Sequence, residues 1–173
     1  MTCCFRGAAP QVVGRRSRAP RRPLESNVVV FPHGPALAAL TDADAPWPAE
    51  AGKPAGLQFR GTQLDAQKRP TLLYSLQAVS VEDFMSPVET AGKTGLRRTL
   101  TLTGPLPDGL YFRVAAGRIM PGRENTWRLD GALTIRVTGG GKAFTRGTGD
   151  RRELLIPMRF ALGSQQLEIE YVW

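Results

Sequence analysis

The chain has 173 residues, a formal net charge of +8, 19 glycines and 14 prolines. This length is sufficient for one domain with a substantial core, and no apolar run reaches the roughly 18 residues that a membrane-spanning helix requires. The Gly and Pro content is typical of a fold with many turns rather than of a helical protein.

The positive charge is concentrated near the N-terminus. Residues 1–24 contain six arginines and no acidic residue, whereas residues 25–173 contain 17 basic and 15 acidic residues. A nucleic-acid-binding surface carries its positive charge on the folded part or on a tail attached to a reader domain. We therefore do not expect nucleic acid to be a partner of the folded part.

Cysteine and histidine are too few for most cofactor sites. Cys3 and Cys4 are adjacent, which disfavours a disulfide between them, and residues 5–173 contain no cysteine. His33 is the single histidine, and we interpret it as a hydrogen-bonding loop residue. We expect no cofactor, and in residues 5–173 no cysteine-based zinc or iron–sulfur site.

Residues 1–26 are rich in Arg, Pro, Ala and Gly and lack apolar periodicity. We interpret them as a disordered basic tail, without the apolar stretch of a secretory signal peptide. The domain is expected to span residues 27–173. Its first strand is predicted at Asn27–Phe31, where β-branched residues cluster, and the short apolar piece Ala36–Leu40 is either a strand or a turn of helix.

A proline-rich linker, Asp42–Pro54, is expected to run extended over the surface, with Trp47 holding it to the body. From Gly56 onward, apolar and polar residues alternate with the period of two that is typical of strands. Gly61 interrupts the first alternating run, where a bulge is expected. Further strands are predicted at residues 57–64, 71–76, 78–84, 96–103, 110–116, 127–129, 132–138, 142–146, 153–160 and 165–173.

The intervening segments are predicted to be loops and turns. Residues 86–95 and 117–125 are expected to form loops, and the glycine-rich segments at 139–141 and 147–150 are expected to form hairpin turns, because no helix follows them to build a phosphate site. Roughly ten short strands predict an all-β antiparallel sandwich, with a barrel as the alternative.

The alternation also predicts which side chains form the core. Phe112 and Ile135 fall on apolar faces, whereas Thr101 and Thr134 fall on the opposite faces. Arg98 is the one residue that interrupts the apolar face of its strand. The same reasoning places residues 153–160 with Leu154, Ile156, Met158 and Phe160 on one face.

No pair of carboxylates has the pattern of a catalytic pair. Glu82 and Asp83 alternate across a strand and face opposite sides. Glu168 and Glu170 share a face, which we interpret as the solvent side of the last strand, where charge discourages edge-to-edge pairing. We therefore expect no catalytic residue and, on balance, no enzymatic activity.

Three aromatic residues, Trp47, Tyr111 and Trp127, are candidate ligand contacts. Carbohydrate-binding sandwiches use exposed rings as platforms, because an aromatic ring offers a large, rigid contact area. The alternative interpretation places Trp127 in the core together with Trp173.

Four runs of the sequence resemble a known region. These runs are FRGTQLDAQKRPTLLYSLQAVSVEDF, LRRTLTLTG, GLYFRVAAG and ELLIPMRFALGSQQLEIEYVW. They resemble a β-sandwich region of large secreted bacterial haem proteins, which look like fusions of dehydrogenase-type β-propeller and c-type cytochrome modules. The resemblance covers roughly residues 28–173.

The resemblance implies a role without implying a haem. This chain lacks the Cys-x-x-Cys-His motif that attaches haem in those proteins, so no haem ligand carries over. What the resemblance implies is a non-catalytic accessory or interaction module of an extracytoplasmic redox protein, periplasmic or secreted, whose partners are the other modules of that protein.

The strand pattern is also loosely similar to galactose-mutarotase-like folds. Mutarotase chemistry in that superfamily depends on paired histidines with a carboxylate, and a single histidine excludes that arrangement. This similarity supports an alternative function, a carbohydrate-binding domain whose partner is a glycan.

Overall fold

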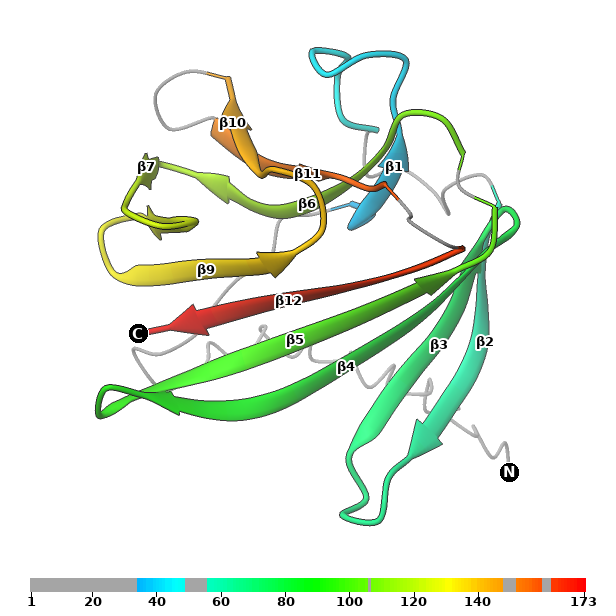
Figure 1. Cartoon of the computed structure of the whole chain (residues 1–173), viewed down its shortest axis with the longest axis horizontal. Helices are drawn as coiled ribbons and strands as arrows, with labels where there is room; N and C mark the ends of the chain where they lie inside the picture. The colour runs from blue at the N-terminus through cyan, green and yellow to red at the C-terminus, as the bar shows by residue number, and fades with distance from the viewer. Residues whose placement is uncertain (1–33, 49–55, 106, 148–151, 160–162) are drawn as a thin grey trace, which may run out of the picture.

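The computed structural model describes residues 34–48, 56–105, 107–147, 152–159 and 163–173. These residues form twelve strands arranged in two antiparallel sheets that face each other (Figure 1). The prediction of an all-β antiparallel sandwich is confirmed. Within the described ranges, no helix suited to crossing a membrane is present. Residues 1–26, with Cys3 and Cys4, and the predicted strand at Asn27–Phe31 and His33 lie outside the described residues.

The two sheets differ in width. The smaller sheet has the order β1-β6-β11-β10, and its strands are β1 (Leu37–Ala39), β6 (Leu110–Gly117), β11 (Arg152–Pro157) and β10 (Phe144–Arg146). The larger sheet has the order β2-β3-β4-β5-β12-β9-β8-β7. Its strands are β2 (Leu57–Leu64), β3 (Pro70–Leu76), β4 (Val79–Thr90), β5 (Lys93–Thr103), β12 (Ser164–Val172), β9 (Leu133–Gly139), β8 (Thr126–Leu129) and β7 (Ile119–Pro121).

The core lies between the facing sheets. Phe112 of β6 and Ile135 of β9 are fully buried in one cluster that draws on both sheets, as the alternation predicts. Thr101 and Thr134 are only half-buried. The hydroxyl of Tyr171 on β12 donates a hydrogen bond to the backbone oxygen of Val114 on β6, 3.2 Å away, which ties the two sheets together.

The prediction of a loop at residues 86–95 is wrong. β4 continues to Thr90 and β5 begins at Lys93, so that only Ala91 and Gly92 form the turn. Both have positive φ angles, 51° and 74°, which match the two-residue hairpin turn whose twist suits paired strands. The alanine at the first turn position hid this signal, because L-residues with a side chain seldom adopt positive φ.

Two further segments differ from the prediction. The expected loop at 117–125 contains the short strand β7, whose Ile119 is buried. Gly139–Gly141 does not form a hairpin, because it carries the chain from β9 in the larger sheet to β10 in the smaller one. A Cβ at Gly139 would lie 2.6 Å from the backbone oxygen of Gln166, so the crossover requires glycine there.

The last two strands confirm one prediction and correct another. The predicted shared face of Leu154, Ile156 and Met158 is confirmed, because all three belong to the core cluster; Phe160 lies outside the described residues. Leu155 is also buried but does not belong to that cluster, and it pairs with Arg113 and Phe144. β12 pairs with β5 on one side and β9 on the other. Glu170 therefore faces neighbouring strands rather than guarding an edge, and its carboxylate lies 2.7 Å from Arg97.

We expect the two faces of β9 to differ in their contribution to stability. Ile135→Ala should lower the free energy of unfolding by about 2–5 kcal/mol, because it leaves a cavity in a closely packed core. Thr134→Ala, one residue earlier on the opposite face, should cost less than about 1 kcal/mol. Urea denaturation of both variants measures the difference, and equal costs would contradict the observed register.

Candidate functional site

The three candidate aromatic residues do not lie together on one exposed face. Trp127 is only 7% exposed and belongs to the core cluster, where Trp173 also packs. Trp47 and Tyr111 are half-buried. Tyr111 of β6 packs edge-to-face against Phe144 of β10, on the far side of β11, with ring centroids 6.1 Å apart.

Trp47 holds residues 42–48 against the smaller sheet, as predicted. Its indole N–H donates to the backbone oxygen of Pro35 at 2.9 Å, and the Arg113 guanidinium lies 4.8 Å from its ring centroid. Arg146 of β10 donates to the backbone oxygen of Ala43 at 2.8 Å. Both arginines also form ion pairs with Glu153 of β11. The contacts of the Trp47 ring therefore hold this loop against the smaller sheet.

A buried ion pair lies on the inner face of the larger sheet. Arg98 of β5 and Asp83 of β4 are 8% and 3% exposed. The Arg98 Nε and Nη2 atoms donate to the two carboxylate oxygens of Asp83 at 2.9 and 2.6 Å. The guanidinium also lies 5.1 Å from the ring centroid of Phe112 on the opposite sheet. Burial alone would lower the pKa of Arg98, but the bonds to Asp83 raise it above its ordinary value.

Two tyrosines pack beside this ion pair. The Tyr74 hydroxyl of β3 lies 3.5 Å from an Asp83 carboxylate oxygen. Burial, reinforced by the negative charge of Asp83, raises the pKa of Tyr74 above its ordinary value. Burial also raises the pKa of Tyr171. Both side chains are therefore held as neutral phenols, which matches their place in an apolar interior.

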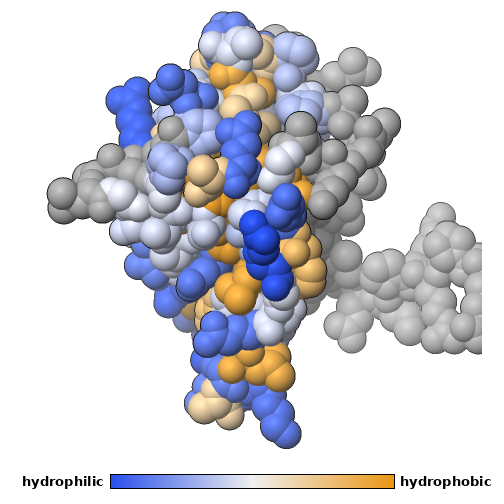
Figure 2. All heavy atoms as spheres, turned by 90° about the vertical axis from the view of Figure 1, so that its right-hand side faces the viewer, coloured by the Kyte–Doolittle hydropathy of each residue, from blue (hydrophilic) through white to orange (hydrophobic). Residues whose placement is uncertain are grey.

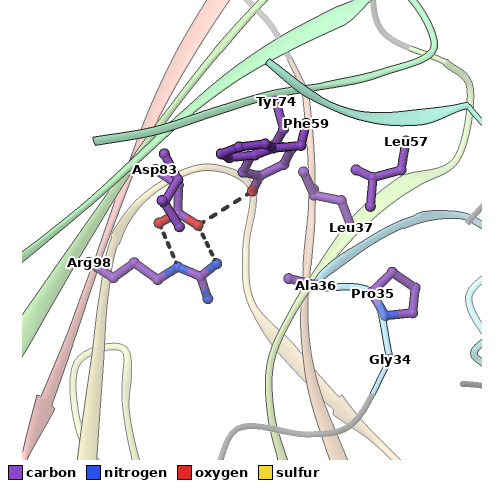
Figure 3. A pocket seen from close by; sticks show the side chains of 10 residues that line it. Gly34, Pro35, Ala36, Leu37, Leu57, Phe59, Tyr74, Asp83 and Arg98 are labelled. Carbon is purple, nitrogen blue, oxygen red and sulfur yellow. Dashed lines mark hydrogen bonds and ion pairs between the residues drawn. The ribbon is translucent and has the colours of Figure 1, made fainter. Parts of the chain in front are cut away.

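A pocket of about 330 Å³ opens between β1 and β2 on this side of the sandwich. Figure 3 shows the Arg98–Asp83 pair at one end of the pocket and the Phe59 and Tyr74 rings beside it. Its lining is otherwise apolar, and it comprises Gly34, Pro35, Ala36, Leu37, Leu57, Phe59, Leu72, Tyr74, Asp83 and Arg98.

The pocket continues into an exposed apolar surface, the β2–β3 face, which we define as Leu57, Phe59, Leu64, Leu72 and Tyr74. Phe59 is 67% exposed and Leu64 is 59% exposed. Phe59 lies opposite Tyr74 in the β2–β3 ladder, so both rings point to the same side of the sheet. Figure 2 shows apolar surface on this side of the molecule, including the projecting hairpin.

Two sequence predictions concern this face. Gly61 marks a bulge, as predicted, because the β2–β3 register shifts between Phe59 and Gly61. Glu82 is exposed and Asp83 is buried, so the two carboxylates face opposite sides, also as predicted. The pairing of Asp83 with Arg98 was not predicted. Each of these charged residues interrupts an otherwise apolar face, Asp83 on β4 and Arg98 on the neighbouring strand β5.

A second pocket, of about 310 Å³, includes Tyr111 together with Asp108 and Arg159. Its rim is polar and lies at the end of the smaller sheet. Among the described residues, no group of three or more His, Cys, Asp or Glu side chains is placed to hold a metal ion.

Comparisons with known proteins provide no assignment. A scan against models of protein families, a search of curated proteins and a search of solved structures each find no match.

We expect the Arg98–Asp83 pair to stabilise the fold only as a pair. Arg98→Ala or Asp83→Ala should each lower the free energy of unfolding by about 3–5 kcal/mol, because either change leaves a buried charge without its partner. The double variant Asp83→Leu with Arg98→Met should cost less than either single change. Urea denaturation at neutral pH measures all three, and single changes that cost nothing would contradict the expectation.

The two buried tyrosines should make stability fall in alkaline solution. Their folded-state pKa values lie above the value of about 10 for an unfolded tyrosine. Their contribution is thus complete below pH about 10 and is lost as the pH rises towards the folded-state pKa values. Tyr171→Phe should flatten this alkaline decline in the free energy of unfolding, as measured by urea denaturation across that range. An unchanged slope would contradict the assignment.

Proposed function

We propose that this chain is a non-catalytic interaction module that binds a partner through the β2–β3 face and its pocket. The observation that carries the proposal is the exposure of Phe59, a large aromatic side chain, at the mouth of an apolar pocket. Isolated exposed apolar residues are common, but a contiguous apolar surface that leads into a pocket is characteristic of an interaction site.

The resemblance described above supplies the proposed setting. An accessory module of an extracytoplasmic redox protein would hold other modules, such as a c-type cytochrome, in place. The apolar character of the β2–β3 face and the near-neutral charge of residues 25–173 suit contact with another protein module.

A carbohydrate-binding function receives less support from the aromatic residues. Trp127 is in the core, and the Trp47 ring is covered by Arg113 and Arg146. Tyr111 lines a polar pocket but is half-buried, so the three rings provide no shared platform on which a sugar could stack.

Photo-crosslinking in cells that produce this chain tests the proposal. A benzophenone amino acid replaces Phe59, and the matched control places the same group at Gln63, which is exposed on the opposite face of β2. We expect a discrete adduct from position 59 and not from position 63. A haem stain of that adduct tests the redox setting.

Equal labelling from both positions would show that the β2–β3 face is not a specific binding surface. An adduct from position 59 that lacks haem would support the proposed interaction module and would contradict the proposal that its partner is a cytochrome.

A further inference from the structure

The larger sheet ends in one long edge strand. β2 has eight residues and, within the described part of the chain, pairs only with β3. The other edge strands of the two sheets, β7, β1 and β10, have three residues each, and β7 ends in a proline. Short strands and prolines prevent pairing at an edge, so β2 is the edge with the capacity to take another strand.

Among the described residues, the backbone groups of β2 that do not bond to β3 belong to the residues that face the pocket. At one end of the ladder the Gln77 N–H donates to the Gly56 oxygen, and at the other the Asp65 N–H donates to the Arg69 oxygen. Hydrogen-bonded and non-bonded pairs alternate in an antiparallel ladder. Counting inward from these two ends places Leu57, Phe59, Thr62 and Leu64 in the non-bonded positions, so that their N–H and C=O groups point away from β3.

The same four residues share the inner face of the sheet. Leu57 and Phe59 line the pocket, and Thr62 lies opposite Leu72 in the ladder. A polypeptide that bonded to these backbone groups would run along the mouth of the pocket. Its alternate side chains would then lie beside those of Leu57 and Phe59 at the pocket, and Phe59 is 67% exposed.

The charge on this edge favours a partner of opposite sign over a second copy of the chain. Arg60 is the one charged residue in β2, and it is exposed with its Nε donating to Ser75 Oγ at 3.2 Å. Two copies of β2 paired with each other would bring two positive charges together with no acid between them, which is unfavourable across neighbouring strands.

We propose that β2 accepts an extended segment of another polypeptide as a ninth strand of the larger sheet. The segment has apolar residues at alternate positions, which lie over the pocket, and an acidic residue on the other face, near Arg60. This mode of binding combines main-chain hydrogen bonds for affinity with side-chain pockets for specificity. The inference rests on the proposed function and adds how the partner is held.

The free edge distinguishes this proposal from binding of an apolar small molecule. An acyl chain would fill the pocket and leave the N–H groups of Leu57 and Phe59 without a protein partner. An added strand satisfies those groups at the same time as it covers the apolar side chains. An added strand would therefore protect the backbone amides of Leu57, Phe59, Thr62 and Leu64 from exchange, whereas an acyl chain would not.

Amide hydrogen exchange measured by NMR tests the proposal. The probe is an acetylated and amidated peptide of sequence TVEVTVE, and the matched control is VVVTETE, which has the same composition without alternation. With nine-tenths of the chain bound, exchange at Phe59 and Thr62 should slow about tenfold, because it then proceeds from the free fraction alone. The amides of Gln58 and Gln63, which face β3, should change little.

A pair of variants at one position tests the backbone contact. Thr62→Pro removes an outward N–H and leaves the β2–β3 bonds in place, as is tolerated on an edge strand, and it should weaken peptide binding at least about tenfold. Thr62→Val retains the N–H and should bind as the parent does. The thermal midpoint of each variant shows that it is folded.

Three results would overturn the proposal: no amide protection at millimolar peptide, equal protection by the control peptide, or equal binding by Thr62→Pro. Dodecanoate below its micelle-forming concentration is the rival probe, and stronger binding of dodecanoate without amide protection would assign the pocket to an acyl chain instead. In the crosslinking experiment, an adduct from position 59 that still forms in a chain carrying Thr62→Pro would support the interaction surface but would exclude binding by strand addition.

Discussion

The Arg98–Asp83 pair marks the boundary between the closed and the open parts of this sandwich. On one side of it, Phe112 and the core cluster fill the space between the sheets. On the other side, Tyr74 and Phe59 line a pocket that reaches the surface. Two opposite charges can lie in such a position because each satisfies the other through two hydrogen bonds. The pair thereby gives the inner end of the pocket a polar wall with a fixed geometry.

The unequal widths of the two sheets create the open part. A four-stranded sheet cannot cover the whole inner face of an eight-stranded one, and the uncovered portion lies at β2 and β3, whose hairpin projects away from the smaller sheet (Figure 1). In most sandwiches both inner faces are covered along their length. Here the apolar alternation of β2 continues past the part of the larger sheet that the smaller sheet covers, and this exposed apolar surface is the basis of the proposed interaction site.

The sequence predicted the fold better than the site. Period-two alternation predicted the two faces of β5, β6 and β9, because burial imposes that period directly. It did not predict the Ala91–Gly92 turn, since the turn depends on backbone angles that alanine rarely adopts. The pocket was not predicted either, because the alternation of β2 suggests that Phe59 is a core residue. Only the topology shows that no strand among the described residues covers it. Arg98 was noticed as an exception to its pattern, but its partner required the register of β4 against β5.

The position of β12 determines the order in which this sheet can be completed. Although β12 is the last strand in the sequence, it lies between β5 and β9 and bonds to both. Before it is in place, β2 to β5 form one group of paired strands and β7 to β9 another, with no ladder between them. Residues 164–172 therefore join two groups of strands that are not paired with each other anywhere else in this sheet. Synthesis must reach them before the protein acquires its continuous eight-stranded surface, and the unjoined edges of β5 and β9 are open to mispairing until then.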